Sequence, residues 1–392
     1  MTKLVEITGK SISGEWGDDD LIGDGVPVLR TANFTNEGKI DYTNVITRQF
    51  KKNIDKKLLK KGDIIIEKSG GSDKYPVGRV VFFDKDDDTY LFNNFTGLLR
   101  VQNQYEWNAK YVFYTLLSFY RKGGTRKFEN KTTGLHNLKL DNYINRVEVK
   151  QCSLTLQNKI VVKLDKIYSI IEDKKNQLKL LDQLIKSRFV EMFGDPSLNE
   201  KCWNTYRLHE LCKKICGGGT PSKSHIEYYS DATIPWVTSK DMKSNYIYSS
   251  KININENGVK HSSAKIVPSN SVIVVIRSGI LKHTLPVAIN KVPVTVNQDL
   301  KVFIPNENMN SLYLLHLLKI SETNILGNVR AVTADNIEFN VLKDRMIIVP
   351  PIELQNQFAD FVQQVDKSKF EIQKSLEETQ KLYDCLMQKY FG

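Results

Sequence analysis

The sequence lacks any apolar run long enough to cross a membrane. Its longest runs, such as VIVVI at 272–276, have the length of a strand, whereas a spanning helix needs about 20 apolar residues. The beginning, MTKLVEITGKS, lacks the apolar stretch of a signal peptide. Cysteine is scarce: the five cysteines are scattered and odd in number, which is typical of reduced thiols. We therefore expect a cytoplasmic protein with no membrane partner.

Acidic side chains are in short supply relative to basic ones. The chain has 45 Asp and Glu against 56 Lys and Arg, which gives a net charge of +11. A surplus of this size suits a polyanionic partner, most often nucleic acid. The 392 residues, 41% of them hydrophobic, exceed what one ordinary core holds, so the length predicts two or more domains.

Proline and glycine are absent from two long stretches, 156–193 and 354–391. The two stretches match each other at a spacing of 198 residues: each begins with LQN, and each ends with a Phe that is followed by Gly. Apolar residues in both follow alternating steps of three and four, the pattern of a coiled-coil seam. Each stretch predicts a helix of roughly 58 Å at about 1.5 Å per residue. Because the chain must pass through a whole domain between them, we expect the two helices to pair antiparallel.

The remainder of the chain repeats more loosely. VPVLRTANF at 26–34 is similar to IPWVTSKDM at 234–242, and GDIIIEKSG at 62–70 is similar to SVIVVIRSG at 271–279. Short apolar strands between turn-forming residues, followed by one late helix, indicate a β-rich globule in each half. The predicted fold class is therefore α+β, with two pseudo-repeated β-rich domains separated by two long antiparallel coiled-coil helices. The predicted segments are 1–150 (first domain), 151–196 (central helix), 197–350 (second domain) and 351–392 (C-terminal helix).

Motifs for catalysis are missing or weak. An adenine methyltransferase needs a glycine-rich cofactor loop and an Asp/Asn-Pro-Pro motif, but the Pro-Pro at 350–351 follows Val and reads as the stop before a helix. GGGT at 217–220 lacks the ending of a phosphate-binding loop. A nuclease set drawn from 141–150 has a spacing common by chance, and the His and Cys residues of 209–216 lack the second pair of a zinc site. We therefore expect a chain without catalytic residues or a bound metal.

Six segments together resemble a known family, the specificity subunits of type I restriction-modification systems. They are GGGTPSKS at 217–224, IPWVTSKDM at 234–242, VIRSG at 275–279, VNQDLKVF at 296–303, VPPIELQNQFADFVQQVD at 349–366 and LDQLIKSRFVEMFGDP at 181–196. The resemblance covers the whole chain. It implies two target-recognition domains held apart by two antiparallel helices, and two methyltransferase subunits as partners, with a translocating restriction subunit where the system also cleaves DNA.

The same resemblance implies how the chemistry is divided. The assembled complex would methylate adenine at N6 from S-adenosylmethionine, and ATP with Mg²⁺ would drive cleavage by the restriction subunit. This chain would be a non-catalytic subunit that binds neither cofactor. One departure is informative: SGEWGDDD at 13–20 stands where the second half has GGGTPSKS. We therefore expect the two domains to read different halves of a bipartite, asymmetric site in double-stranded DNA.

Base-edge readers and phosphate contacts are expected on the loops of both domains, because Arg forks onto guanine and Thr meets adenine or thymine edges. The predicted DNA-binding residues are Arg30, Thr31, Lys68, Lys74, Arg126 and Lys127 in the first domain, and Lys223, Thr238, Lys240, Arg277 and Arg330 in the second. Two alternatives stay open from the residues alone. The chain could be a DNA methyltransferase or nuclease in its own right, or a coiled-coil scaffold with no role on DNA.

The helices carry more apolar residues than one seam between two helices can bury. Another helix, from a partner subunit, is expected to cover the rest. The predicted partner-docking residues are Leu180, Leu184, Phe189, Phe193, Phe361, Phe370, Leu382 and Leu386.

Overall fold

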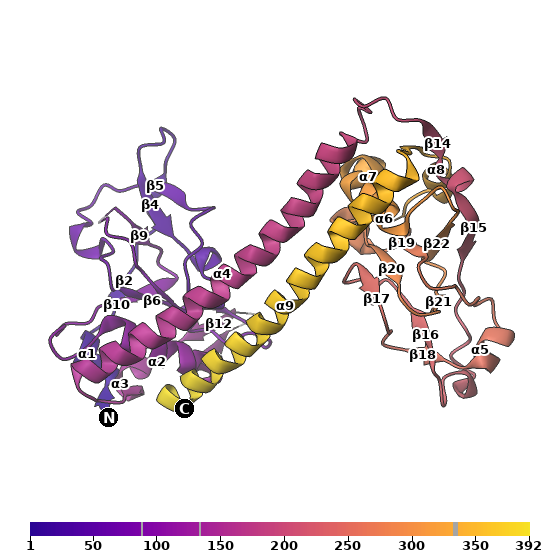
Figure 1. Ribbon diagram of the computed structural model, residues 1–392. Coiled ribbons are helices and arrows are strands. Elements are labelled where there is room, and N and C mark those ends of the chain that lie inside the picture. Colours follow the sequence, from indigo (N-terminus) through magenta and orange to yellow (C-terminus); the bar gives the residue numbers. More distant parts are fainter. Residues whose placement is uncertain (88, 133–134, 332–335) are drawn as a thin grey trace. The chain divides into compact units, whose positions relative to one another are not determined.

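The computed structural model describes residues 1–87, 89–132, 135–331 and 336–392, and it divides into two compact units. Unit 1 contains residues 1–174 and 375–392, and unit 2 contains residues 175–374. Both chain termini belong to unit 1 (Figure 1). The division differs from a cut by sequence segments, because each unit takes a part of both long helices.

The two long helices predicted from the missing prolines and glycines are confirmed. Helix α4 (Leu154–Phe193) and helix α9 (Ile352–Phe391) have 40 residues each and run uninterrupted, magenta and yellow in Figure 1. The Pro-Pro pair at 350–351 does precede a helix start, and the Pro351 carbonyl accepts the N–H groups of Leu354 and Gln355 at 3.0 and 3.2 Å. Among the described residues, no helix combines the length and the apolar character needed to cross a membrane.

Within unit 1, the first half of α4 pairs antiparallel with the end of α9. The rings of Tyr168 and Tyr383 meet edge to face at 5.8 Å, and Lys174 Nζ donates to Ser375 Oγ at 2.8 Å. From the first of these contacts to the second, the residue number on α4 rises from 168 to 174 and that on α9 falls from 383 to 375, so the helices run in opposite directions. Lys174, which interrupts the apolar pattern of α4, therefore reaches across to the paired helix.

Within unit 2, the second half of α4 pairs antiparallel with the first half of α9. Lys369, the interruption in the α9 pattern, donates to Asp182 at 2.5 Å, and the rings of Phe189 and Phe358 meet at 5.3 Å. At the spacing of 198 residues Lys174 matches Ile372 and Lys369 matches Ile171, so the two lysines lie three positions apart in the repeat, and each bonds to the other helix. The antiparallel pairing predicted from the sequence is present in each unit.

Unit 1 is built from small sheets beside three short helices. Its main antiparallel sheet has the order β2-β10-β6-β8, a second sheet has the order β3-β5-β4-β9 with β4 and β9 parallel, and smaller sheets have the orders β11-β12-β7 and β1-β13. The strands are β1 (Thr2–Lys3), β2 (Ile12–Ser13), β3 (Asp18–Asp19), β4 (Val26–Leu29), β5 (Ile46–Gln49), β6 (Ile64–Glu67), β7 (Ser69–Gly71), β8 (Val80–Phe82), β9 (Leu91–Phe92), β10 (Thr96–Leu99), β11 (Glu129–Thr132), β12 (Leu135–Leu138) and β13 (Glu148–Val149). The helices are α1 (Leu4–Thr8), α2 (Ala109–Arg121) and α3 (Leu140–Arg146).

Unit 2 repeats this plan. Its main sheet has the order β15-β22-β19-β20-β17, and smaller sheets have the orders β18-β16-β21 and β14-β23. The strands are β14 (Thr205–Arg207), β15 (Cys212–Gly217), β16 (Ile234–Val237), β17 (Tyr246–Ile247), β18 (Asn253–Ile254), β19 (Val272–Val275), β20 (Val287–Asn290), β21 (Thr295–Val296), β22 (Leu300–Pro305) and β23 (Met346–Ile348). The helices are α5 (Glu256–Lys260), α6 (Ser311–Ile320), α7 (Glu322–Ala331) and α8 (Phe339–Lys343).

The LQN motif that opens each long stretch locks the long helix to its own unit. Gln157 is fully buried; its side chain accepts the Asn108 N–H at 2.9 Å and donates to the carbonyls of Glu106 and Cys152, each at 2.9 Å. Gln355 does the same in unit 2, where it accepts the Asn310 N–H at 2.9 Å. The repeat in the sequence is therefore a repeated joint between a long helix and the cap of the late domain helix.

In each unit a glycine follows the first strand of the main sheet, and there the backbone lies close to the end of a strand of another sheet, β9 in unit 1 and β21 in unit 2. A Cβ atom on Gly14 would collide with the carbonyl oxygen of Asn93, and a Cβ on Gly218 would collide with that of Val296. Only glycine fits this approach of two backbones. The two units therefore share the same arrangement of strands at this point, which we call the frame. The loop after the glycine starts from the same position of the frame in each unit.

Candidate nucleic-acid interface

Strands β4 and β16 end in the same type of turn, in which a side chain accepts a backbone N–H three residues earlier. Asn33 Oδ1 accepts the Arg30 N–H at 3.0 Å, and Asp241 Oδ2 accepts the Thr238 N–H at 2.9 Å. The Thr238 hydroxyl also donates to Asp241, at 2.8 Å. Thr238 thus holds its turn in shape, while Lys240 at the tip is exposed.

The turn after β4 is reinforced by an arginine that the sequence patterns did not single out. Arg79 donates to the carbonyls of Phe34 and Thr31 at 2.8 and 2.9 Å. Arg30 is half-buried and donates to the Asn44 carbonyl at 3.1 Å. Of the two candidates in this turn, Arg30 is therefore committed to the loop through its guanidinium, whereas the bond at Thr31 is made by the backbone carbonyl and does not involve its side chain.

The end of strand β6 places a buried carboxylate beside a half-buried lysine. Burial raises the pKa of Glu67, while its ion pair with Arg79 at 3.2 Å opposes that rise. Glu67 ends the apolar run III at 64–66 in the sequence, and a carboxylate at such a position indicates that a cationic side chain elsewhere in the chain pairs with it. Lys68 donates to Ser13 Oγ at 3.1 Å, and burial, followed by the charge of Lys57, lowers the pKa of Lys68.

Three of the predicted cations of unit 1 gather into one exposed patch. Arg126 donates to the carbonyl of Asp73 at 3.1 Å, which brings it beside Lys74 in the next position of that loop. The Lys74 ammonium lies 5.1 Å from the ring centroid of the exposed Tyr75. Lys127 follows Arg126 and is also exposed. We call Lys74, Arg126 and Lys127 the cationic patch of unit 1.

The other predicted residues of unit 2 lie on separate elements. Lys223 is exposed on the connection between β15 and β16. Arg277 is exposed but pairs with Asp299, whose Oδ1 lies 2.7 Å from Nε and 2.6 Å from Nη2. Arg277 would have to exchange this carboxylate for a DNA group. Arg330 belongs to α7, and its side chain is outside the described residues.

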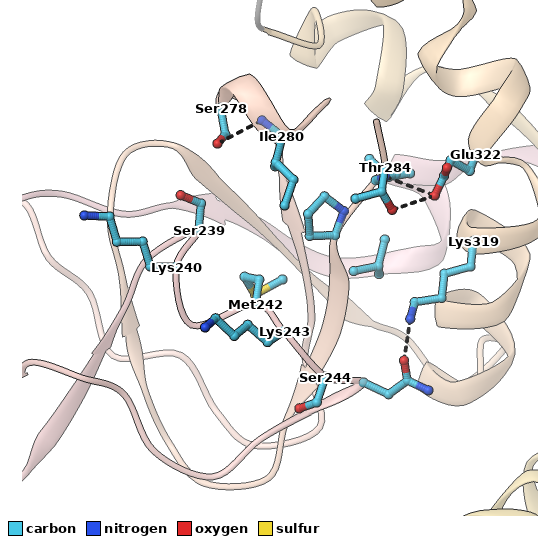
Figure 2. A pocket seen from close by; sticks show the side chains of 14 residues that line it. Ser239, Lys240, Met242, Lys243, Ser244, Ser278, Ile280, Thr284, Lys319 and Glu322 are labelled. Atoms are coloured by element: carbon cyan, nitrogen blue, oxygen red, sulfur yellow. Dashed lines mark hydrogen bonds between the residues drawn. The ribbon is translucent and has the colours of Figure 1, made fainter. Parts of the chain in front are cut away.

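A pocket of about 580 Å³ opens in unit 2 between the turn that carries Lys240 and the segment 278–287 (Figure 2). Lys319 enters it from α6 and donates to Asn245 Oδ1, and burial lowers the pKa of Lys319. Glu322 accepts the side-chain hydroxyl of Thr284 at 3.1 Å and is therefore engaged. The lining combines apolar side chains such as Met242 and Leu285 with serine hydroxyls and lysine side chains.

The cysteines near β15 behave as structural residues. Burial raises the pKa of Cys212 to about 12, and its thiol donates to the Leu208 carbonyl at 3.3 Å. His209 faces Asp344, with 3.0 Å between Nδ1 and Oδ1. Across the described ranges of the chain, no three His, Cys, Asp or Glu side chains converge as a metal site would require.

Three of the predicted partner-docking residues are covered by this chain itself. Phe189 and Phe193 are fully buried in unit 2, where Phe189 stacks on Tyr313 of α6 with ring centroids 5.5 Å apart. Leu386 is buried in the core of unit 1. The apolar surplus of both helices is thus partly absorbed by the domains against which they pack.

The other docking candidates remain accessible. Leu180 is 61% exposed and Leu184 46% on α4, and Phe370 is 67% exposed and Leu382 50% on α9. Phe361 is half-buried beneath the guanidinium of Arg188, 5.8 Å from its ring centroid. A free apolar surface therefore exists on each helix.

Comparison with known proteins identifies a family. The model of the type I restriction modification DNA specificity domain matches residues 4–180 and again residues 200–381. The specificity subunit of the type I restriction enzyme EcoR124I/EcoR124II of Escherichia coli is 34% identical over 220 residues, covering 55% of this chain and 52% of the relative. The MjaIX specificity subunit of Methanocaldococcus jannaschii is 30% identical over 190 residues, covering 47% of this chain and 43% of the relative. The chain thus matches about half the length of these curated relatives.

Two solved structures are similar over the whole chain. The S subunit of a type I restriction-modification system from M. genitalium has a TM-score of 0.62 at 14% identity, with 100% of this chain and 95% of the other covered. A structure described for assembly and conformational transition of the type I R-M system has a TM-score of 0.56 at 16% identity, with 100% and 96% covered. At these identities the likeness is one of fold. The matches of the family model, which together cover most of the sequence, decide the relationship: the chain belongs to the type I restriction modification DNA specificity domain family, and it carries that domain twice.

Proposed function

We propose that this chain is the DNA-recognition subunit of a type I restriction-modification complex, in which each domain reads one half of a bipartite, asymmetric site. The single observation that carries the proposal is that the two units share the same strand frame but carry loops of different sequence on it. The glycine-held strand ends and the glutamine joints recur in both units, whereas the segments that follow, WGDDDLIGDG at 16–25 and TPSKSHIEYYSDAT at 220–233, share no pattern. Two similar scaffolds with different surfaces suit two different half-sites.

The charges support a phosphate-binding role around those loops. The net charge is +11, and exposed cations occur in both units: the cationic patch of unit 1, and Lys223 with Lys240 in unit 2. Exposed Lys and Arg side chains bind backbone phosphates and fix the register of a protein on the duplex, while base-edge contacts specify sequence. Lys68, Arg277 and Arg330 stay candidates. Thr31 also stays a candidate, whereas Arg30 and Thr238 are better assigned to holding the turns that present other residues.

The chemistry is assigned to partner subunits. Two methyltransferase subunits would dock on the exposed apolar surface of the helices, which includes Leu180, Leu184, Phe370 and Leu382, with Phe361 at its edge. They would bind S-adenosylmethionine and methylate adenine at N6. Restriction subunits would add ATP-driven cleavage. The chain itself would be non-catalytic and cytoplasmic, and its mechanism would be positional: it would set which bases the methyltransferases can reach.

The experiment is a titration of the purified complex, this chain with its methyltransferase, against duplex DNA at 50 to 200 mM salt. The logarithm of the association constant should fall linearly with the logarithm of salt, with a slope of about −0.9 for each phosphate contacted. Lys240→Ala and Lys223→Ala should each reduce the slope by about one.

Two results would contradict this function. Lack of salt-dependent DNA binding by the complex would support a scaffold without a role on DNA. Methylation or cleavage by the pure chain without partners would show an enzyme in its own right. Lys213→Ala, a change of an exposed lysine at the start of β15 and outside the predicted set, serves as the matched control and should leave the slope unchanged.

A further inference from the structure

The loops that follow the first strand of each main sheet occupy equivalent places in the two units. In unit 1 the Glu15 N–H donates to the Phe92 carbonyl at 2.9 Å, and in unit 2 the Gly219 N–H donates to the Val296 carbonyl at 3.1 Å. The acceptors end β9 and β21, which pair in parallel with β4 and β16. Loop 16–25 and loop 220–233 therefore leave the same point of the frame and return to the same strand.

Each of these loops holds large aliphatic side chains in solvent. Leu21 is 92% exposed and Ile22 is 83% exposed in loop 16–25, and Ile226 is 74% exposed in loop 220–233. Aliphatic residues exposed at equivalent tips in both units indicate a surface that is covered in use.

Loop 16–25 is a held structure. Asp20 accepts the N–H groups of Gly23 and Gly25 at 2.8 and 3.0 Å, and a hydrogen bond with the Thr47 side chain, together with these two, lowers the pKa of Asp20. Gly23 has a φ of +88°, in the region that favours glycine. The tip formed by Leu21 and Ile22 is thus fixed by the bonds of the residues on either side of it.

The other carboxylates of loop 16–25 are engaged inside unit 1. Asp18 pairs with Lys51 at 2.9 Å, and Asp19 pairs with Arg48, whose guanidinium lies 4.1 Å from the ring centroid of Trp16. These ion pairs counter part of the repulsion that an acidic loop exerts on DNA phosphates, while Asp24 accepts a hydrogen bond from the neutral Gln49 side chain. The loop can approach a duplex with its aliphatic tip in front.

Loop 220–233 is also fixed in its conformation, but by different hydrogen bonds. The Tyr229 hydroxyl donates to the Pro221 carbonyl at 2.7 Å, and Asn255 Nδ2 donates to the Glu227 carbonyl at 2.6 Å. The rings of His225 and Tyr228 stack with centroids 4.9 Å apart. Ile226 stands beside this stack, three residues from the exposed Lys223.

We propose that the aliphatic tips of these two loops, Leu21 with Ile22 and Ile226, contact the thymine methyl groups of the two half-sites. The inference rests on the proposed function and names residues that would read the bases. Apolar side chains recognise thymine through its C5-methyl group in the major groove. The different composition of the loops favours DNA over a protein partner: two copies of one methyltransferase would meet like surfaces, whereas two half-sites differ.

The test uses the complex of this chain with its methyltransferase and duplexes in which thymine of one half-site is replaced by deoxyuridine, which lacks only the methyl group. A half-site methylated at adenine contains at least one thymine. Wild-type affinity should fall about fourfold for each methyl contact removed, which corresponds to about one buried CH₂ group. The double variant L21S/I22S should bind the duplex more weakly and lose its sensitivity to deoxyuridine in one half-site, and I226S should lose it in the other.

Tyr105→Ser is the matched control, because Tyr105 of unit 1 is 92% exposed and lies outside both loops; it should retain sensitivity at both half-sites. Unchanged deoxyuridine sensitivity in all variants would overturn the inference, as would equal loss at both half-sites from one variant. Loss of co-purification with the methyltransferase would assign the tips to a protein partner instead. If the wild-type complex binds no duplex, the proposed function fails and this inference falls with it.

Discussion

Lengthening both long helices at one level should change the distance between the two half-sites. The boundary between the units falls after Lys174 in α4 and after Lys374 in α9, and the bond between Lys174 and Ser375 stays within unit 1. Matched four-residue insertions, after Lys174 and after Lys374, therefore leave the contacts inside each unit unchanged. The insertion in α9 is needed because the two helices pair antiparallel. An insertion in α4 alone would shift the contacts between α4 and α9 by four residues on one side of the insertion.

The expected size of the change follows from helix and DNA geometry. Four residues add about 6 Å and turn a helix by about 40° beyond one full turn. One base pair of DNA adds about 3.4 Å and about 34° at 10.5 base pairs per turn. The rotation matches one base pair, while the rise would allow nearly two. We expect the unspecified gap to grow by one base pair, with slight bending that absorbs the remaining length.

The assay is the methylated motif of the insertion variant, read genome-wide beside the wild type. Both half-site sequences should be retained. Matched two-residue insertions serve as the control, because they add about 3 Å but rotate the apolar seam by about 200°; they should abolish methylation. Full methylation with an unchanged gap in the four-residue variant would show that the helices do not set the distance.

Three further outcomes are expected. Replacing Leu180 and Leu184 with Glu should abolish co-purification with the methyltransferase, whereas Leu198→Glu, at an exposed residue beyond α4, should not. Gln355→Leu removes three buried hydrogen bonds to the backbone and should lower the free energy of unfolding by about 3 kcal/mol, measured by urea denaturation. Burial lowers the pKa of His316 to about 3, below its ordinary value of 6.5, so the unfolded chain binds the proton first and stability should fall as pH drops from about 7 to 4. His316→Leu should flatten that dependence in thermal melts.

The sequence predicted the elements whose signals are long and periodic. Helix bounds of 156–193 and 354–391 lie within two residues of the observed ones, because forty residues without proline or glycine average out local ambiguity. The late helix of each globule was also predicted, and α2 and α6 confirm it. The strands were predicted only as β-rich character. Many have two to four residues, and their pairing is set by contacts far apart in the sequence, as between β4 and β9.

The candidate site residues could be predicted less well, because the apolar periodicity of a helix does not show what covers each of its faces. The sequence pattern put Phe189 and Phe193 off the seam, which correctly indicated a further packing partner. In the structure both also meet Phe358 of α9, and the pattern could not tell a partner subunit from Tyr313 of the same chain. Residue type likewise could not separate Thr238, which caps its turn, from Lys240, which the turn exposes. Such distinctions depend on the tertiary fold.

The central claim is that two domains on a common frame read two different half-sites, and a domain exchange tests it most directly. Residues 197–350 would be replaced by the corresponding domain of another family member, and the methylated motif would be determined genome-wide with each chain. We expect a bipartite, asymmetric motif for the native chain, of which one half changes in the exchange while the other half and its adenine stay the same. A motif in which both halves change, or neither, would contradict the account.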